Sequence, residues 1–200
     1  MDAPPSEGLV EGRSCGTCTV CCYTLPIDTS EIQKLPSVVC RHCTGRGCGI
    51  YESRPSPCRG FYCGWRLLPQ LDDEWRPDKS GVLITPQSDD IPSEFELREG
   101  IEFLITGGEA AVRRPALLDF LTLCVRRRVA TFVSIPGPEG FFAAKVLVNN
   151  RLSEAAARND RSAILSLLLR MVEQAKDHAF QRATLSHATG HEGNLTVPKV

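Results

Sequence analysis

The sequence predicts an α+β protein in which a small cysteine-rich, metal-stabilised N-terminal module packs on a mixed or antiparallel sheet with helices. Nine of the ten cysteines lie between residues 15 and 63, and the tenth is Cys124. The segment 14–66 has few regularly spaced apolar residues, so it could hardly fold without the free energy of metal binding. From residue 67 onward, apolar runs and a helical stripe indicate ordinary strands and helices.

The composition divides the chain into four parts. Residues 1–13, rich in Pro, Gly and Glu, are expected to be a flexible lead-in. Residues 14–66 form the cysteine-rich metal-binding module, residues 67–183 the α+β body, and residues 184–200 a flexible, polar C-terminal tail.

One regular element is predicted inside the module. Asp28 can cap a short helix, Glu31 can return the bond from the third position, and Pro36 can end the helix.

The elements of the body follow from apolar runs and from the residues that break them. Gly107-Gly108 is expected to be only a turn, and Pro115 suits the first turn of a helix. The last helix is expected to carry an apolar stripe at helical spacing. The predicted elements are strands 81–85 and 101–106, a helix over 114–126, a strand pair 128–135 and 141–148 across the turn 136–140, and a helix from about 161 to 183.

The charge balance argues against some partners. Lysine plus arginine number 23 and aspartate plus glutamate 24, so neither nucleic acid nor a membrane surface is predicted as a partner. The most apolar stretch, 163–172, is too short to span a bilayer and contains Arg170. The acidic N-terminus lacks the apolar run of a signal peptide. We therefore expect a cytoplasmic protein, in which thiols stay reduced and cysteines favour metal binding over disulfides.

The first cysteine cluster has the pattern CxxCxxCC, from Cys15 through Cys18 to Cys21 and Cys22. Two residues between thiolates let both sulfurs face one ion, and Gly16 suits the tight turn that this needs. Adjacent thiols usually point in different directions. The Cys21–Cys22 pair therefore suggests two ions, a polynuclear cluster, or one cysteine that is not a ligand.

Two further clusters, one from Cys40 to Cys48 and one from Cys58 to Cys63, complete the set of candidate metal ligands. His42 is either a ligand or a donor to a ligand, so nine thiols and one imidazole could fill two four-ligand sites with two donors left over. Soft thiolates select zinc, copper(I) or iron–sulfur clusters, and the sequence does not separate zinc from iron. A set of structural disulfides is the alternative, and it needs an oxidising compartment. The candidate ligands are Cys15, Cys18, Cys21, Cys22, Cys40, Cys43, Cys48, Cys58 and Cys63.

Other side chains near the cysteines have two interpretations each. Arg54 and Arg59 could offset the negative charge of thiolates or hold an anion, but capping of carbonyls or pairing with Glu52 is the interpretation we favour. Aromatic residues among them could shield a metal or simply pack over the module. Cys124 lies among apolar residues of a predicted helix, so a buried inert thiol is expected there.

The cysteine pattern resembles a known family. The motif CxxCxxCC, followed by Cys43, Gly47-Cys48-Gly-Ile-Tyr51, Arg54-Pro55, Cys58-Arg59 and Cys63-x-Trp65, is similar to the CxxCxxCC proteins, described as zinc- or iron-chelating domains. Flagellin lysine N-methylase is related in motif, which implies a link to iron–sulfur chemistry. The resemblance covers about residues 14–66 and implies metal chelation by these cysteines, without a substrate.

The function predicted is therefore metal binding at a polythiolate site holding zinc or iron. The alternative is an enzyme that contains an iron–sulfur cluster and performs redox chemistry or group transfer. A third interpretation treats the metal as a staple for a protein interface. The sequence lacks a phosphate-binding loop, a dinucleotide glycine fingerprint and a Gly-x-Ser-x-Gly elbow, so no catalytic residue is predicted.

Overall fold

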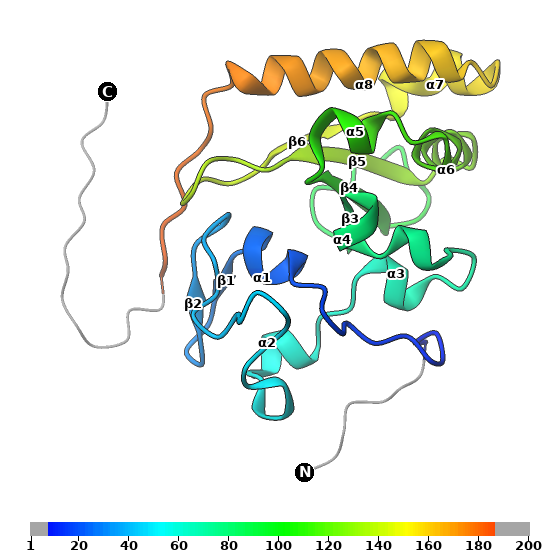
Figure 1. Ribbon diagram of the computed structural model, residues 1–200. Helices are drawn as coiled ribbons and strands as arrows, with labels where there is room; N and C mark the ends of the chain where they lie inside the picture. The colour runs from blue at the N-terminus through cyan, green and yellow to red at the C-terminus, as the bar shows by residue number, and fades with distance from the viewer. Residues whose placement is uncertain (1–7, 187–200) are drawn as a thin grey trace.

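The computed structural model describes residues 8–186 and has the predicted α+β architecture (Figure 1). Its main sheet has four strands in sequence order. The central pair is parallel and both outer pairs are antiparallel, so the sheet is mixed. The strands are β3 (Val82–Gln87), β4 (Gly100–Ile105), β5 (Ala130–Ile135) and β6 (Ala144–Leu147).

The strands form where β-branched and aromatic residues alternate between two buried faces. Ile84 lies opposite Phe103 in the β3–β4 register, and both belong to the main core together with Val133 of β5. The other face carries Phe132, which packs with Ile91 in a second, smaller cluster.

Four helices supply the remaining core of the body. Figure 1 shows α8 running across the top of the sheet, with α5 and α6 beneath it. Pro115 opens α6 as predicted, and the Asp160 carboxylate caps α8 by accepting a hydrogen bond from the Ala163 N–H at 2.9 Å. The helices are α5 (Gly108–Val112), α6 (Pro115–Arg126), α7 (Asn149–Ala157) and α8 (Arg161–Lys176).

Three of the elements predicted from the sequence were wrong. The short helix at 28–36 is instead a hairpin of β1 (Ile27–Asp28) and β2 (Gln33–Lys34), because the backbone and hydroxyl of Thr29 both bond to the Ile32 carbonyl and close a turn.

The other two errors concern the end of the last helix and the region of Gly107 and Gly108. The last helix stops at Lys176, well before residue 183, and Gly107 precedes the short helix α5 rather than making only a turn. Helix α7 was not predicted; it begins at Asn149, whose side chain bonds to the backbone of residues 129 and 131.

Short helices lie within the cysteine module and connect it to the body. Trp65 and Trp75 lie on these helices and are buried in the main core. The short elements are α1 (Val20–Thr24), η1 (Tyr51–Ser53), α2 (Ser56–Arg59), α3 (Gly64–Leu67), η2 (Asp73–Trp75) and α4 (Pro77–Ser80).

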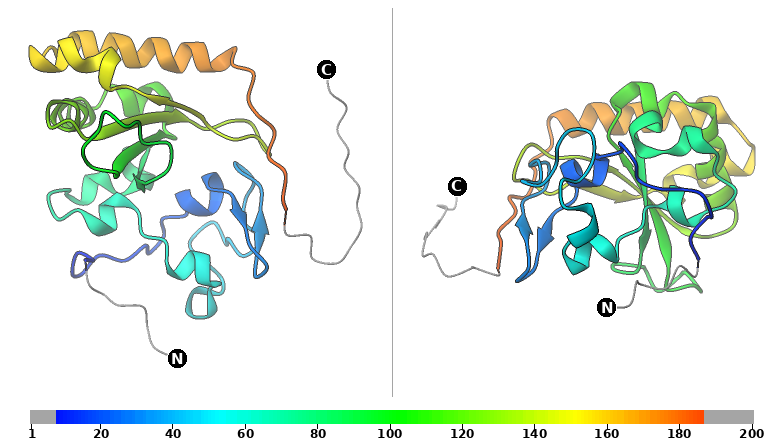
Figure 2. Two further views of the ribbon diagram at one scale, coloured as in Figure 1. Left: turned by 180° about the vertical axis from the view of Figure 1, so that it is seen from behind. Right: turned by 60° about the horizontal axis from the view of Figure 1, so that its bottom comes forward.

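The cysteine module is also held by two segments from later in the chain. The loop after β5 contacts it where Gly140 N–H donates to the Pro36 carbonyl at 2.9 Å and Ser37 Oγ donates to the Gly137 carbonyl at 2.8 Å. The segment 178–186 then runs past this loop to β1, as Figure 2 shows from behind. There Ser186 donates from N and Oγ to Asp28 at 2.7 and 2.6 Å.

The two terminal parts predicted to be flexible are described only in part. Residues 1–7 and 187–200 lie outside the described range, whereas Val10 N–H donates to the Arg66 carbonyl at 2.9 Å.

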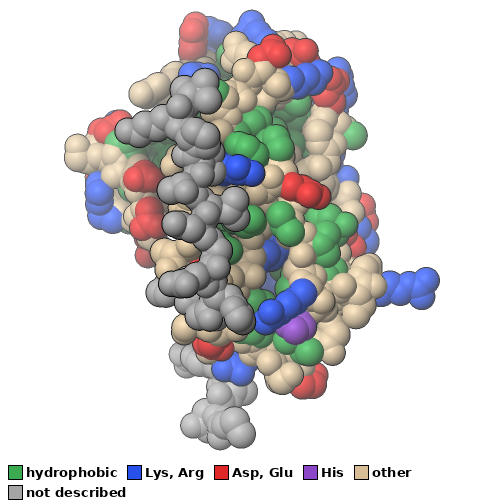
Figure 3. All heavy atoms as spheres, turned by 90° about the vertical axis from the view of Figure 1, so that its left-hand side faces the viewer, with side chains coloured by type: hydrophobic (Ala, Val, Ile, Leu, Met, Phe, Trp, Pro, Cys, Tyr) green, Lys and Arg blue, Asp and Glu red, His purple; other side chains and the backbone are tan. Residues whose placement is uncertain are grey.

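On the face turned toward the viewer in Figure 3, hydrophobic side chains interleave with lysine and arginine side chains around a hollowed area. Within residues 8–186, every helix is too short or too polar to cross a membrane.

Helix α3 packs on β3 through a position that tolerates only glycine. A Cβ at Gly64 would lie 2.5 Å from Ile84 Cγ2 and 2.8 Å from Ile84 Cβ. We predict that Gly64→Ala lowers the free energy of unfolding by about 1–3 kcal/mol, because a packed strand must move to admit the methyl group. Urea unfolding measures this change.

Gly60→Ala is the matched control, because its Cβ would meet nothing closer than the Ser56 carbonyl oxygen at 3.5 Å. Equal stability losses in the two variants would show that the α3–β3 contact is not tightly packed.

Candidate metal centre

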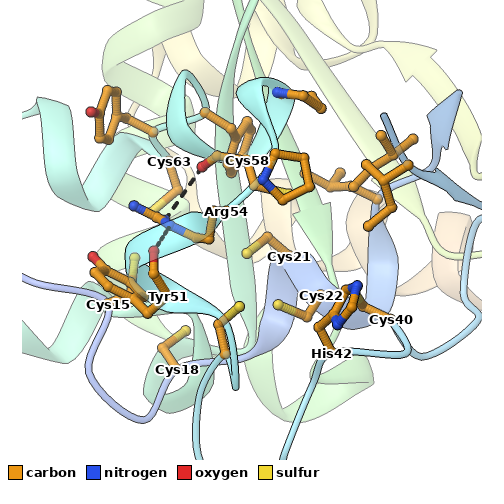
Figure 4. Close-up of a pocket in the computed structure, with 18 of the residues that line it drawn as sticks. Cys15, Cys18, Cys21, Cys22, Cys40, His42, Tyr51, Arg54, Cys58 and Cys63 are labelled. Atoms are coloured by element: carbon orange, nitrogen blue, oxygen red, sulfur yellow. Dashed lines mark hydrogen bonds between the residues drawn. The ribbon is translucent and has the colours of Figure 1, made fainter. Parts of the chain in front are cut away.

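Eight of the nine predicted cysteine ligands line one cavity of about 340 Å³ (Figure 4). The ninth, Cys43, pairs with Cys48 in an isolated β-bridge. All ten cysteines of the chain are free thiols in the structure. The cysteines that line the cavity are Cys15, Cys18, Cys21, Cys22, Cys40, Cys48, Cys58 and Cys63.

Local backbone structure places these thiols. The Cys18 N–H donates to the Cys15 carbonyl at 2.9 Å, which closes the turn predicted from the CxxC spacing, with Gly16 at a φ of +52°. Helix α1 carries Cys21 and Cys22. The Cys40 N–H donates to the Cys22 carbonyl at 3.0 Å, which brings the second cluster beside the first.

The thiols of the cavity have two sets of close neighbours, which meet at Cys21 and Cys22. The first contains Cys15, Cys18, Cys21 and Cys63, since Cys63 interacts with Cys15 and with Cys18. In the second, Cys58 interacts with Cys40, Cys22 and Cys48, and Cys22 also bonds to Cys43. The first group joins thiols of the CxxCxxCC cluster to Cys63, and the second joins Cys22 of that cluster to cysteines that follow it in the chain.

The adjacent pair links the two groups. The thiols of Cys21 and Cys22 are hydrogen-bonded to each other rather than pointing apart as expected. This bond raises the pKa of Cys21, with burial as the second cause. It lowers the pKa of Cys22 to about 6, against the opposing effect of burial and with help from the Lys34 charge. Cys22 is therefore the thiol of this pair that ionises first.

Burial keeps other thiols protonated when no metal is bound. It raises the pKa of Cys18 to about 11 and raises the pKa values of Cys58 and Cys63. Metal binding at these cysteines would therefore have to release protons.

Lys34 is the cation that sequence reasoning missed. It is 5% exposed, and its Nζ donates to the carbonyls of Tyr23, Leu25 and Leu35 at 3.0, 2.7 and 3.1 Å. Burial lowers its pKa, while the nearby charges of cysteines, Cys40 first, raise it. One signal could have identified it, because Lys34 is the only lysine between residues 14 and 66.

Arg54 caps carbonyls, as the favoured interpretation held. Its Nε donates to the Tyr51 carbonyl at 3.1 Å, its Nη1 to the Cys58 carbonyl at 3.3 Å, and its guanidinium lies 3.9 Å from the centre of the Tyr51 ring. Its charge also lowers the pKa of Cys22. Arg54 therefore caps carbonyls and also favours the Cys22 thiolate, and Arg59 donates to Ser56 Oγ at 3.4 Å.

Arg66 lines the cavity, and Arg13 binds the backbone on either side of Arg66. Arg66 Nη1 lies 3.8 Å from Cys15 Sγ. Arg13 donates to the carbonyls of Trp65, Leu68 and Leu71, the Leu68 bond being 3.1 Å long. These contacts join residues more than fifty positions apart, so no local pattern could indicate them.

The remaining candidates are placed as follows. His42 lines the cavity, and its Nε2 accepts a hydrogen bond from Arg41 Nε at 3.1 Å. Cys124 is buried in α6, away from the cavity, and burial raises its pKa to about 12, so the prediction of a buried thiol is confirmed.

The donors fit a soft metal in kind. However, no group of three or more His, Cys, Asp or Glu side chains within residues 8–186 is arranged to hold a metal ion as the side chains lie. Trp65 Nε1 and Arg66 Nε are buried beside the cavity without a hydrogen-bond partner among those residues. Metal ligation would therefore require cysteine side chains to turn about χ1.

Comparison with known protein families, with curated proteins and with solved structures finds no match to this chain. The resemblance to the CxxCxxCC proteins stays a prediction that rests on the motif residues.

Arg13 is predicted to hold the first cysteine turn against α3. Arg13→Ala should lower the free energy of unfolding by about 1.5–3 kcal/mol, because bonds from a charged donor to three carbonyls are lost. Arg13→Lys should recover only part of this, since an ammonium group cannot reproduce the planar fork. Denaturant unfolding measures both. Arg46→Ala, at an exposed side chain, is the control; a loss as large as that of Arg13→Ala would contradict this role.

Cys22 is predicted to be the thiol that ionises first. In reduced, chelator-treated protein, iodoacetamide should label Cys22 fastest at neutral pH, and its rate should fall roughly tenfold per pH unit below pH 6. Peptide mapping by mass spectrometry identifies the labelled site. Cys58, whose pKa is raised by burial, is the internal comparison. Labelling of Cys58 ahead of Cys22 at pH 7 would contradict the assignment.

Proposed function

We propose that this protein binds a soft metal, zinc or iron, through the cysteines of its N-terminal module. The observation that carries the proposal is the gathering of eight free thiols from separate segments around one cavity. Thiolates at this density select zinc or iron over magnesium and calcium. The resemblance of the same residues to the CxxCxxCC proteins also supports it.

The proposal assigns the ligands to two groups, according to which thiols are close neighbours. Cys15, Cys18, Cys21 and Cys63 would hold one ion, and the second would take four of the five cysteines that remain. Lys34, Arg54 and Arg66 lie where they would offset the charge of the thiolates. The proposed location is the cytoplasm, where thiols are kept reduced.

A bound metal would supply the free energy that the module lacks in apolar burial. The residues of the chain would do the rest. Helix α1 and the turn from Cys15 to Cys18 position thiols. Aromatic side chains limit the access of water, and one of them, Trp65, is itself only 5% exposed.

An iron–sulfur enzyme is the second candidate. One observation favours it, because the adjacent Cys21 and Cys22 both line the same cavity, as ligands of a polynuclear cluster would. This candidate predicts iron together with acid-labile sulfide and a brown, reducible chromophore after anaerobic purification. Stoichiometric zinc without such absorption would favour a binding protein with a closed site.

Metal content should depend on both groups of cysteines. We predict that Cys18→Ser and Cys58→Ser each reduce the metal bound per chain and destabilise the protein, because folding and binding are linked. Elemental analysis and thermal unfolding measure the two effects on one sample. Cys124→Ala, outside the cavity, should retain the full metal content. Unchanged metal and stability in both serine variants would remove these residues from the site.

A further inference from the structure

Cys43 and Cys48 lie opposite each other in the hairpin formed by residues 42–49. They make an isolated antiparallel β-bridge. Backbone hydrogen bonds flank this bridge on both sides, so the two cysteines occupy a non-hydrogen-bonded position, at which Cα atoms lie about 4.5 Å apart. The flanking bonds run from Gly49 N–H to the His42 carbonyl at 2.8 Å and from Thr44 N–H to the Gly47 carbonyl at 3.0 Å.

This backbone geometry suits a disulfide. A disulfide joins residues whose Cα atoms lie about 4.4–6.8 Å apart. Residues directly opposite each other in an antiparallel pair also have their side chains on the same face. The loop between the two cysteines has glycine where the backbone needs a positive φ, at Gly45 (+77°) and Gly47 (+141°). Cys43 and Cys48, which are free thiols in the structure, can therefore be joined by turning their side chains alone.

The neighbouring thiols are less well placed for such a bond. Cys21 and Cys22 are adjacent, and adjacent Cα atoms lie about 3.8 Å apart, which is below the range of a disulfide. Cys22 bonds to Cys43, but it belongs to α1, so no strand pairing fixes the separation of these two backbones. Cys40 is buried, so it is screened from oxidants in solution.

The hairpin is open to solvent at its tip and reaches the cavity at its base. Thr44, Gly45 and Arg46 are exposed. Cys48 lines the cavity, whereas Cys43 is the one candidate ligand of the nine that does not. The pair therefore places a thiol of the proposed metal site directly opposite a thiol that lies outside the cavity.

We propose that Cys43 and Cys48 are a redox pair that a peroxide oxidises to a disulfide, and that this disulfide withdraws Cys48 from metal binding. The second part rests on the proposed function, in which the second ion takes four of the five cysteines outside the first group. The disulfide leaves that group with three thiols, one fewer than a closed tetrahedral site takes. The thiols that remain are Cys22, Cys40 and Cys58.

The reaction balances between two thiols and one molecule of hydrogen peroxide. The thiolate of one cysteine attacks a peroxide oxygen and becomes a sulfenic acid; the O–O bond breaks, and the hydroxide that leaves takes up the proton which that thiol had lost. The second thiol then attacks the sulfenic sulfur. The S–O bond breaks, and its oxygen leaves as water with the proton of the second thiol. The two sulfurs together lose the two electrons that the peroxide gains, and a dithiol reductant reverses the step by thiol–disulfide exchange.

The test treats the reduced full chain with one equivalent of hydrogen peroxide, as purified and after treatment with a chelator. Iodoacetamide then blocks the remaining thiols, and mass spectrometry of a tryptic digest maps the disulfides. Trypsin cuts after Arg41 and Arg46, so peptide 42–46 contains Cys43 as its single cysteine. We expect this peptide to be linked mainly to peptide 47–59, with fragmentation placing the bond at Cys48 rather than at Cys58.

Other linkages would contradict the pairing. Peptide 35–41 contains Cys40, and peptide 14–34 contains Cys22. Linkage of peptide 42–46 mainly to either of these, or to Cys58, overturns the proposal. The peptide map needs no substitution, so it decides the pairing even if a variant does not fold.

The metal content of the same samples tests the second part. The chain should lose about half of its metal when the disulfide forms, because one of two ions lacks a fourth thiolate. Cys43→Ser keeps four other cysteines in the second group, so it should keep its metal at the same peroxide concentration. Cys124→Ala, outside the cavity, is the matched control and should behave like the unsubstituted chain. Equal metal loss from Cys43→Ser and the unsubstituted chain overturns the link between disulfide and metal.

The outcomes separate the redox pair from the metal site. A chain that holds metal but has Cys43 and Cys48 both alkylated after peroxide treatment overturns the redox pair and leaves the metal proposal standing. A chain without metal that links Cys43 to Cys48 upholds the redox pair and overturns the proposed function.

Discussion

Gly64 lies against Ile84 with no side chain between them, and this contact joins the thiol cavity to the sheet of the body. Because α3 sits directly on β3, Cys63 at its start faces the first cysteine turn while Trp65 enters the main core. Arg13 then closes the same junction from the N-terminal side by binding the carbonyls that follow. The cavity therefore has a rigid wall that belongs to the body, although most of its residues belong to the module.

The balance of charge in the cavity follows from burial. Burial raises the pKa values of Cys18, Cys58 and Cys63, so these thiols stay protonated without a metal, whereas the pKa of Cys22 is lowered. Lys34 is buried in the same region and has three backbone carbonyls as partners. A fixed cation that is satisfied by the backbone can offset thiolates when they form without having to move. The structure thus combines thiols that burial mostly keeps protonated with a buried lysine whose charge favours the Cys22 thiolate.

The sequence allowed the strands, α6 and the set of cysteines to be predicted, because apolar periodicity and CxxC spacing are local signals. It did not allow the hairpin at 27–34 to be predicted, because Asp28, Glu31 and Pro36 are local signals for a helix. The turn that Thr29 closes forms instead, and the strand that follows it buries Lys34. Arg13 and Arg66 could not be assigned, since their contacts span more than fifty residues. The grouping of thiols likewise depends on how distant segments meet.

The bond between Ser186 and Asp28 spans 158 positions and bears on the order of assembly. A ribosome releases the nine clustered cysteines early, yet the elements that enclose them come later: β3, then the loop after β5, then the segment ending at Ser186. Until residue 186 has left the exit tunnel, the thiols lack part of their enclosure. The growing chain therefore passes through a period in which chaperones, oxidants and metal donors can reach sulfurs that the finished fold partly encloses.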